Sequence, residues 1–139
     1  MNTPNRFSQH AHIVIRLALA ILFIWFGFLE GHNPGMWTGF VPGWVVNMFN
    51  GNATMLVYMN AWFEIVAGVC LLIGFQVRIV SALLALHLFF IAGSIGFGPL
   101  GLRDFTLSFA MLSVAIAGSD MWSLDRRFEK QEAIQGSRI

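Results

Sequence analysis

Glu64 is a carboxylate in the middle of residues 58–78, a stretch apolar enough to lie in a lipid bilayer. An ionised carboxylate at such depth costs at least about 2.5–3.5 kcal/mol, so it must be paired, protonated or directed toward a wet cavity. Asn60, Glu64 and Gly68 recur at every fourth position and share one helix face. Because glycine permits close helix approach and asparagine can hydrogen-bond across a helix contact, we expect this face to point into the protein.

His87 is predicted at a similar depth in the following apolar stretch. A buried glutamate and histidine could share a proton, which suits proton exchange with a bound ligand. A stripe of small residues on the same stretch is turned away from the histidine and consists of Ser81, Ala85, Ala92 and Gly96. If this stripe packs against the helix of Glu64, His87 faces elsewhere, for example toward another subunit. The sequence leaves both arrangements open.

A second polar group is expected near one membrane surface and consists of Glu30, His32, Arg103 and Asp104. Asp104 suits a helix N-terminus, where a carboxylate accepts hydrogen bonds from free backbone N–H groups. Arg103 has three candidate partners, namely Glu30, Glu64 and Asp104. The group either fixes helix register as an ion network or adds a ligand site. No metal site is predicted, because these residues lack a diagnostic metal-ligand spacing.

Four apolar runs must position these residues, near 13–29, 53–75, 77–97 and 105–122. Each is close to the length of about 20 residues that a helix needs to cross a bilayer. The chain is 57% hydrophobic and 11% charged, whereas soluble domains have about 25% charged residues. We therefore predict one all-α domain, 1–139, that is an integral membrane four-helix up-down bundle with the lipid bilayer as its first partner.

The basic residues predict the orientation of this bundle. Only Arg103 falls on one side, and the other side has Arg6, Arg16, Arg78, Arg126, Arg127, Lys130 and Arg138. By the positive-inside rule, both termini are expected in the cytoplasm, with the bundle in the cell (inner) membrane. Arg16 and Arg78 are expected to reach lipid phosphates or to bond helix-end carbonyls. Residues 123–139 are expected to form a polar cytoplasmic helix and tail, and the net charge of +1 argues against a nucleic-acid partner.

The long connection between the first two runs, residues 31–52, has no acidic residue, lysine or arginine but is rich in aromatic side chains. Pro34, Pro42 and several glycines argue against one continuous helix. Tryptophan and phenylalanine suit the headgroup layer of a membrane, which predicts an interfacial loop. The loop is either a flap that rests on the membrane or a lid over a site between the helices.

With these positions identified, residues 14–125 resemble the DoxX-like family of small four-helix membrane proteins. The resemblance depends on the order and spacing of RLALAILFIWFGFLE, WTGFVPGW, EIVAGVCLLIGFQVR, LRDFTLSFAMLSVAIAG and SLD. It implies several roles: relatives include membrane subunits of thiosulfate:quinone oxidoreductases, proteins linked to oxidative-stress complexes, and assembly helpers for membrane proteins.

The resemblance implies a subunit of a quinone-linked redox complex, and we expect the quinone between the helices near Glu64, His87 and Arg103. Asn60, Glu30, His32 and Asp104 complete the candidate site. The chain has no cofactor-binding motif of its own, so enzymatic turnover would require a partner subunit. The alternative is a non-catalytic accessory or assembly subunit of a larger membrane complex. Other membrane subunits or further copies of the chain are the expected protein partners.

Overall fold

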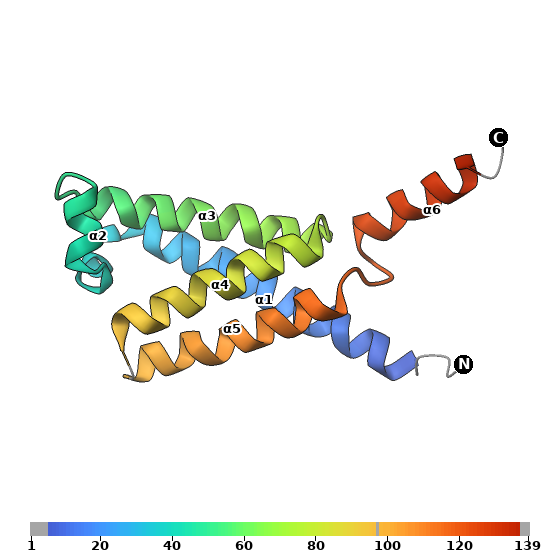
Figure 1. The fold of residues 1–139 in the computed structure, drawn as a ribbon, viewed down its shortest axis with the longest axis horizontal. Coiled ribbons are helices and arrows are strands. Elements are labelled where there is room, and N and C mark those ends of the chain that lie inside the picture. Colours follow the sequence, from blue (N-terminus) through green and yellow to red (C-terminus); the bar gives the residue numbers. More distant parts are fainter. Residues whose placement is uncertain (1–5, 97, 137–139) are drawn as a thin grey trace.

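A computed structural model describes residues 6–96 and 98–136 (Figure 1). Its elements, in chain order, are α1 (Arg6–His32), η1 (Pro34–Met36), η2 (Thr38–Phe40), α2 (Gly43–Met48), α3 (Ala53–Ile73), α4 (Val77–Ile95), α5 (Pro99–Ala117) and α6 (Leu124–Gly136). Within these residues there is no β-strand, and four helices (His10–His32 of α1, and α3, α4 and α5) are long and apolar enough to cross a membrane. The predicted all-α membrane bundle is confirmed.

Two helices differ from their predicted bounds. α1 begins at Arg6 rather than near residue 13, and α5 runs from Pro99 to Ala117 rather than over 105–122. A proline fits the first helical position because its missing N–H has no partner there, and Gly118 ends α5 with a positive φ of 78°. Asp104 therefore lies inside α5, where it is buried, and the prediction that it caps a helix is wrong. The predicted end of α4, Phe97, lies outside the described residues.

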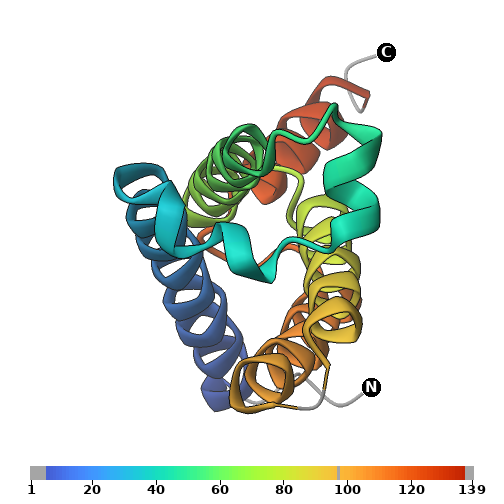
Figure 2. The same cartoon turned by 90° about the vertical axis from the view of Figure 1, so that its left-hand side faces the viewer.

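The four long helices form two closely packed pairs. α1 packs along α3, and α4 packs along α5, whereas α3 touches α4 and α1 touches α5 much less. Figure 2 looks along the bundle from the end that carries residues 33–52, and shows the four long helices arranged in a ring with this segment crossing in front. We call this end the loop end and the opposite end, which carries α6, the tail end.

Two glycines bring α1 and α3 together. A Cβ atom on Gly68 would lie 2.8 Å from Ile24 Cγ1 and 3.0 Å from the Ala20 carbonyl oxygen, and one on Gly27 would lie 2.7 Å from the Ala61 carbonyl oxygen. Such distances are too short for any larger residue without moving the backbone. The helix face that carries Glu64 and Gly68 is therefore buried, as expected for a face that points into the protein.

Apolar side chains fill the tail-end half of the bundle. This core includes Leu19, Phe23, Leu71, Val77, Leu84, Met111 and Val114 from all four long helices. Toward the loop end the two helix pairs enclose a cavity instead, so the closely packed half holds the walls of this cavity in place.

Candidate functional site

A cavity of about 510 Å³ lies between the helix pairs in the loop-end half. Its walls are mostly apolar and aromatic, with side chains such as Leu22, Phe23, Phe26, Phe63, Leu88, Ile91 and Leu107. Its polar lining consists of Glu30, Asn60, Glu64, His87, Ser94, Arg103 and Asp104. A mostly apolar space of this volume with a few convergent polar groups is typical of small-molecule sites.

Asn60 connects the two acidic residues of the α1–α3 pair. Its Nδ2 donates to Glu30 Oε2 at 2.7 Å and to Glu64 Oε1 at 3.3 Å. Glu30 ends up 8% exposed and Glu64 5% exposed, so this amide is a shared donor for two buried carboxyl groups. Asn60 therefore makes the bond across the helix contact that its sequence position led us to expect.

Glu64 and His87 face each other across the gap between α3 and α4. His87 Nε2 lies 3.9 Å from Glu64 Oε1, which is too far for a direct hydrogen bond. In the described part of the chain, neither His87 Nε2 nor Glu64 Oε2 has a hydrogen-bond partner, although both atoms are buried. Ser81 Oγ is likewise buried without a partner, but only Glu64 and His87 line the cavity, where a polar group of a ligand could bond to them.

The small-residue stripe lies on α4, which packs mainly against α5, and its loop-end members Ala92 and Gly96 contact α5, while His87 turns toward Glu64. Ser81, Ala85 and Ala92 are buried on this stripe. A Cβ atom on Gly101 of α5 would collide with the Gly96 carbonyl oxygen and lie 3.4 Å from that of Ala92. The small residues thus serve the α4–α5 contact.

Arg103 joins α5 to α1. Its Nε donates to Asp104 Oδ1 at 2.7 Å, so of the three candidate acidic partners Asp104 forms the ion pair. The guanidinium carbon lies 4.7 Å from the centre of the Phe26 ring, a distance at which a cation–π attraction operates. Arg103 therefore presents a fixed positive charge at the cavity wall.

His32 is the one predicted site residue that the structure places away from the cavity. It is exposed, and its ring stacks on Phe28 with the centroids 6.5 Å apart. Among the described residues, no group of three or more histidine, cysteine, aspartate or glutamate side chains could hold a metal ion.

The segment 33–52 covers the loop end of the cavity. Its residues Trp37, Phe40, Val41, Pro42, Trp44 and Val45 line the cavity, and the Trp37 ring meets Phe26 edge to face with centroids 6.2 Å apart. We call this segment the lid loop. The sequence left open a flap that rests on the membrane and a lid over a site between the helices. The geometry favours the lid.

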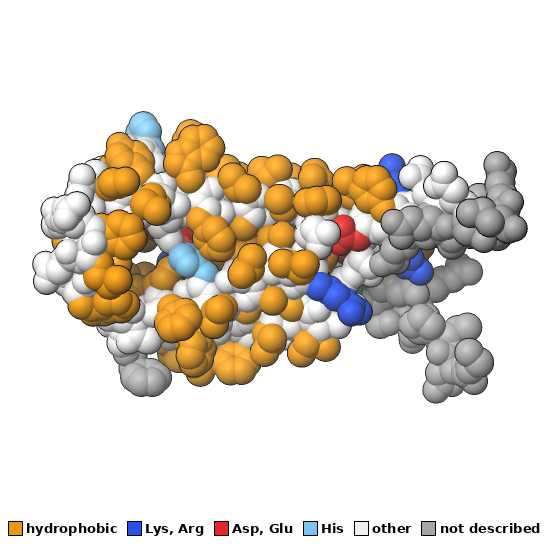
Figure 3. Space-filling view, turned by 45° about the horizontal axis from the view of Figure 1, so that its top comes forward, with side chains coloured by type: hydrophobic (Ala, Val, Ile, Leu, Met, Phe, Trp, Pro, Cys, Tyr) orange, Lys and Arg blue, Asp and Glu red, His pale blue; other side chains and the backbone are white. Residues whose placement is uncertain are grey.

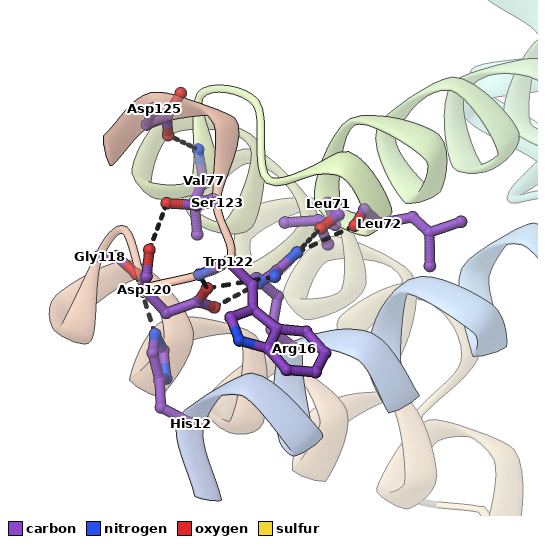
Figure 4. A network of polar contacts seen from close by, with 10 residues as sticks. All are labelled: His12, Arg16, Leu71, Leu72, Val77, Gly118, Asp120, Trp122, Ser123 and Asp125. Carbon is purple, nitrogen blue, oxygen red and sulfur yellow. Dashed lines mark hydrogen bonds and ion pairs between the residues drawn. The ribbon is translucent and has the colours of Figure 1, made fainter. Parts of the chain in front are cut away.

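At the tail end, a buried ion pair connects α1 to the segment between α5 and α6, and the same arginine also contacts the end of α3 (Figure 4). Arg16 is 1% exposed; its Nε lies 2.6 Å from Asp120 Oδ2, and its Nη1 donates to the carbonyls of Leu71 and Leu72 at the end of α3. Of the two predicted roles, Arg16 thus hydrogen-bonds the helix-end carbonyls, and it is too deeply buried to reach lipid phosphates. Its partner Asp120 was not among the predicted residues, although an aspartate directly after an apolar run, at the end that carries Arg16, is a signal for such a pair.

Further contacts fasten the same end. The carboxylate of Asp125 accepts hydrogen bonds from the backbone N–H groups of Gln76 and Val77 at 2.7 and 2.9 Å and so caps α4. His12 Nε2 donates to the Gly118 carbonyl at 2.9 Å. Arg78 is exposed, and its guanidinium lies against Gly118. These contacts hold the two helix pairs together at the tail end.

Comparison with known families matches residues 11–96 to the family model described as DoxX. No curated protein and no solved structure matches the chain. The matched segment spans α1, the lid loop, α3 and α4, and it carries Glu30, Asn60, Glu64 and His87. Since the match covers more than half of a chain that has four apolar helices, the chain belongs to the DoxX family of membrane proteins.

Proposed function

We propose that this protein is the membrane subunit of a quinone-linked redox complex, and that a quinone ring binds in the cavity beside Glu64 and His87. One observation carries the proposal: two buried polar atoms without partners, Glu64 Oε2 and His87 Nε2, lie in an otherwise apolar and aromatic cavity. A flat ring with polar atoms at its edge complements such a space, because apolar walls bury its faces while the polar atoms meet hydrogen-bonding groups.

The polar lining fits the needs of a quinone. Quinone carbonyls accept hydrogen bonds, and His87 Nε2 and the Arg103 guanidinium are donors at the cavity wall. Glu64 is a group that can hold or release a proton there. When bound, a quinone supplies two-electron chemistry coupled to proton exchange, and a partner subunit would exchange the electrons. The residues of this chain orient the ring, exclude water and handle protons.

Quinone binding by the purified protein tests this function. Trp37 and Trp44 line the cavity, so quenching of their fluorescence reports occupancy. We expect Glu64→Gln and His87→Ala each to weaken binding by at least about tenfold, because each leaves a polar atom of the ligand or protein unpaired. His32→Ala is the matched histidine control, since His32 lies outside the cavity, and it should bind as wild type. Unchanged binding in both cavity variants would remove the proposed site.

A non-catalytic accessory subunit is the second candidate function. The observation in its favour is that Asn60 joins α3 to α1 and Arg16 joins α1 to α3 through hydrogen bonds, as a purely structural network would. Co-purification separates the two functions. A stoichiometric partner that carries flavin, haem or metal, with a turnover that Glu64→Gln does not change, would favour the accessory role.

We further propose that the bundle lies in the cell membrane with the tail end in the cytoplasm. α1 begins and α6 ends at this end (Figure 1), and Arg78, Arg126, Arg127 and Lys130 are exposed there. In the described part of the chain, Arg103 is the one arginine or lysine of the opposite half, and Arg138 lies outside that part. A cysteine in place of Asn47 in the lid loop should react with an impermeant maleimide in intact cells. Labelling only after lysis would contradict this orientation.

A further inference from the structure

We infer that the cavity opens sideways into the bilayer between α3 and α4, and that its ligand is an amphiphile whose polar ring sits at Glu64 while a long apolar tail leaves through this opening. The identity of the ring rests on the proposed function. The presence of a tail and its route go beyond the proposed function, and we infer them from the shape and chemistry of the cavity wall.

The exposure of the lining residues is uneven around the cavity. On α3, Met59 is 49% and Phe63 36% exposed, and on α4 Phe90 is 66% exposed, although all three line the cavity. These three residues form a wall of the cavity that borders the outside of the bundle. The lining residues of α1 and α5 are all buried or half-buried. The lid loop also has exposed lining residues, Phe40 at 41% and Trp44 at 67%, but these lie at the loop end of the bundle and not on one of its sides. The opening is therefore on the α3–α4 side.

The other seams between the long helices are closed by identified contacts. The α1–α3 seam is closed by the approach at Gly27 and Gly68, and α4 packs along α5. Between α5 and α1, Arg103 lies over the Phe26 ring. At the loop end, Trp37 lies against the same ring. Among the seams between the long helices, only the one between α3 and α4 combines sparse helix contact with exposed lining side chains.

The opening is apolar, which indicates what passes through it. We call Met59, Phe63, Phe90 and Ser94 the α3–α4 mouth. The Ser94 hydroxyl donates to the Phe90 carbonyl at 2.8 Å, so it offers little polarity to the surroundings. Figure 3 shows hydrophobic side chains over this face, around a hollow toward the loop end in which a histidine lies beside an acidic side chain.

A mouth of this chemistry favours a lipid-soluble ligand over a water-soluble one. Methionine and phenylalanine adapt to a flexible hydrocarbon chain, and the exposed faces of α3 and α4 on either side, such as Trp62 and Leu86, continue the apolar surface. The ring of Phe63 meets the His87 ring edge to face at 4.8 Å between centroids. Phe63 thus marks the boundary between the apolar mouth and the polar end of the cavity.

The decisive experiment compares two probes: a para-benzoquinone ring without a tail, and the same ring with a decyl chain. For each protein variant, we divide the dissociation constant of the tailless ring by that of the decyl-quinone. A larger ratio means a larger contribution of the tail to binding. We expect Met59→Ala and Phe90→Ala to reduce this ratio by up to about tenfold relative to wild type, because each removes apolar contact with the chain. Phe28→Ala is the matched control, since Phe28 is as exposed as Phe90, at 65%, but lies outside the cavity.

The outcomes separate this inference from the proposed function. If Glu64→Gln weakens binding of the tailless ring while the ratio stays the same in the mouth variants and in Phe28→Ala, the lateral opening is wrong and the quinone site stands. If wild-type protein binds neither probe, the proposed function fails and the inference with it. The mouth side chains are exposed, so their truncation should leave folding intact, which circular dichroism checks.

A second measurement locates the tail directly. A decyl-quinone with a diazirine at the chain end should crosslink, on illumination in nanodiscs, to peptides that contain the α3–α4 mouth. Competition by the unlabelled decyl-quinone distinguishes specific crosslinks from random insertion. Competed crosslinks on α1, α5 or the lid loop in place of α3 and α4 would overturn the proposed route.

Discussion

Single residues show that the protein uses buried polar groups in two ways. At the tail end, Arg16 donates to Asp120 and to the ends of α3, so the buried charge is compensated by protein groups. At the cavity, Glu64 and His87 each keep a buried atom without a partner in the described residues. The first arrangement suits a structural contact, and the second suits a site that a ligand completes.

This difference leads to a prediction for the tail-end pair. Arg16→Leu should lower the free energy of unfolding by about 3–5 kcal/mol, because it leaves the Asp120 carboxylate buried and unpaired. Adding Asp120→Asn should recover a large part of the loss, since the amide oxygen still accepts from the Trp122 N–H. Chemical denaturation in detergent micelles measures both, with exposed Arg126→Leu as the control. Equal stability of the single and double variants would contradict a buried ion pair.

At the scale of helices, the pairing of α1 with α3 depends on glycine rather than on large interlocking side chains. Gly27 and Gly68 each meet a backbone oxygen of the other helix. Apolar packing between helices in a membrane gains little from the hydrophobic effect, because lipid tails are equally apolar, so close backbone approach becomes the main source of attraction. The two glycines thereby set the position of Glu30 relative to Asn60.

Gly27→Ala and Gly68→Ala should each lower the free energy of unfolding by about 1–3 kcal/mol, because the added methyl group forces the helices apart. Gly93→Ala is the matched control in α4: a Cβ atom there meets nothing within 4 Å, and alanine favours a helix over glycine by about 0.5–1 kcal/mol. Denaturation in micelles compares the three variants. A destabilising Gly93→Ala with neutral Gly27→Ala and Gly68→Ala would show that the helix pairs are assigned wrongly.

The sequence predicted which helices exist better than it predicted which helices pair. The four apolar runs and the inward face of Asn60, Glu64 and Gly68 could be read from length and spacing. The partner of the α4 stripe could not, because a membrane helix is apolar toward lipid and toward protein alike. Likewise, the start of α5 was missed because its first turns, with Pro99 and Gly101, resemble a loop in composition.

At the scale of the whole molecule, the two ends differ in how they are closed. The tail end is closed by an ion pair and a filled apolar core. The loop end is closed by the lid loop, whose short helices contain no buried residue. Segments with few buried contacts open with little free energy, so we expect the lid loop to open while the rest of the bundle stays folded.

A cysteine that replaces Leu56, which is half-buried and lines the cavity, can report such opening to a water-soluble maleimide in a Cys70→Ala background. Trp37→Ala with Trp44→Ala should speed its labelling by up to about tenfold, since an edge-to-face aromatic pair such as Phe26–Trp37 contributes about 0.5–1.5 kcal/mol. Exposed Thr54→Cys, outside the cavity on the same helix, should label at an unchanged rate. If the tryptophan substitutions speed labelling of both cysteines equally, the lid loop affects the whole end of α3 and does not control access to the cavity. A loop that covers the cavity should change the labelling rate of the cysteine inside it and leave that of the cysteine outside it unchanged.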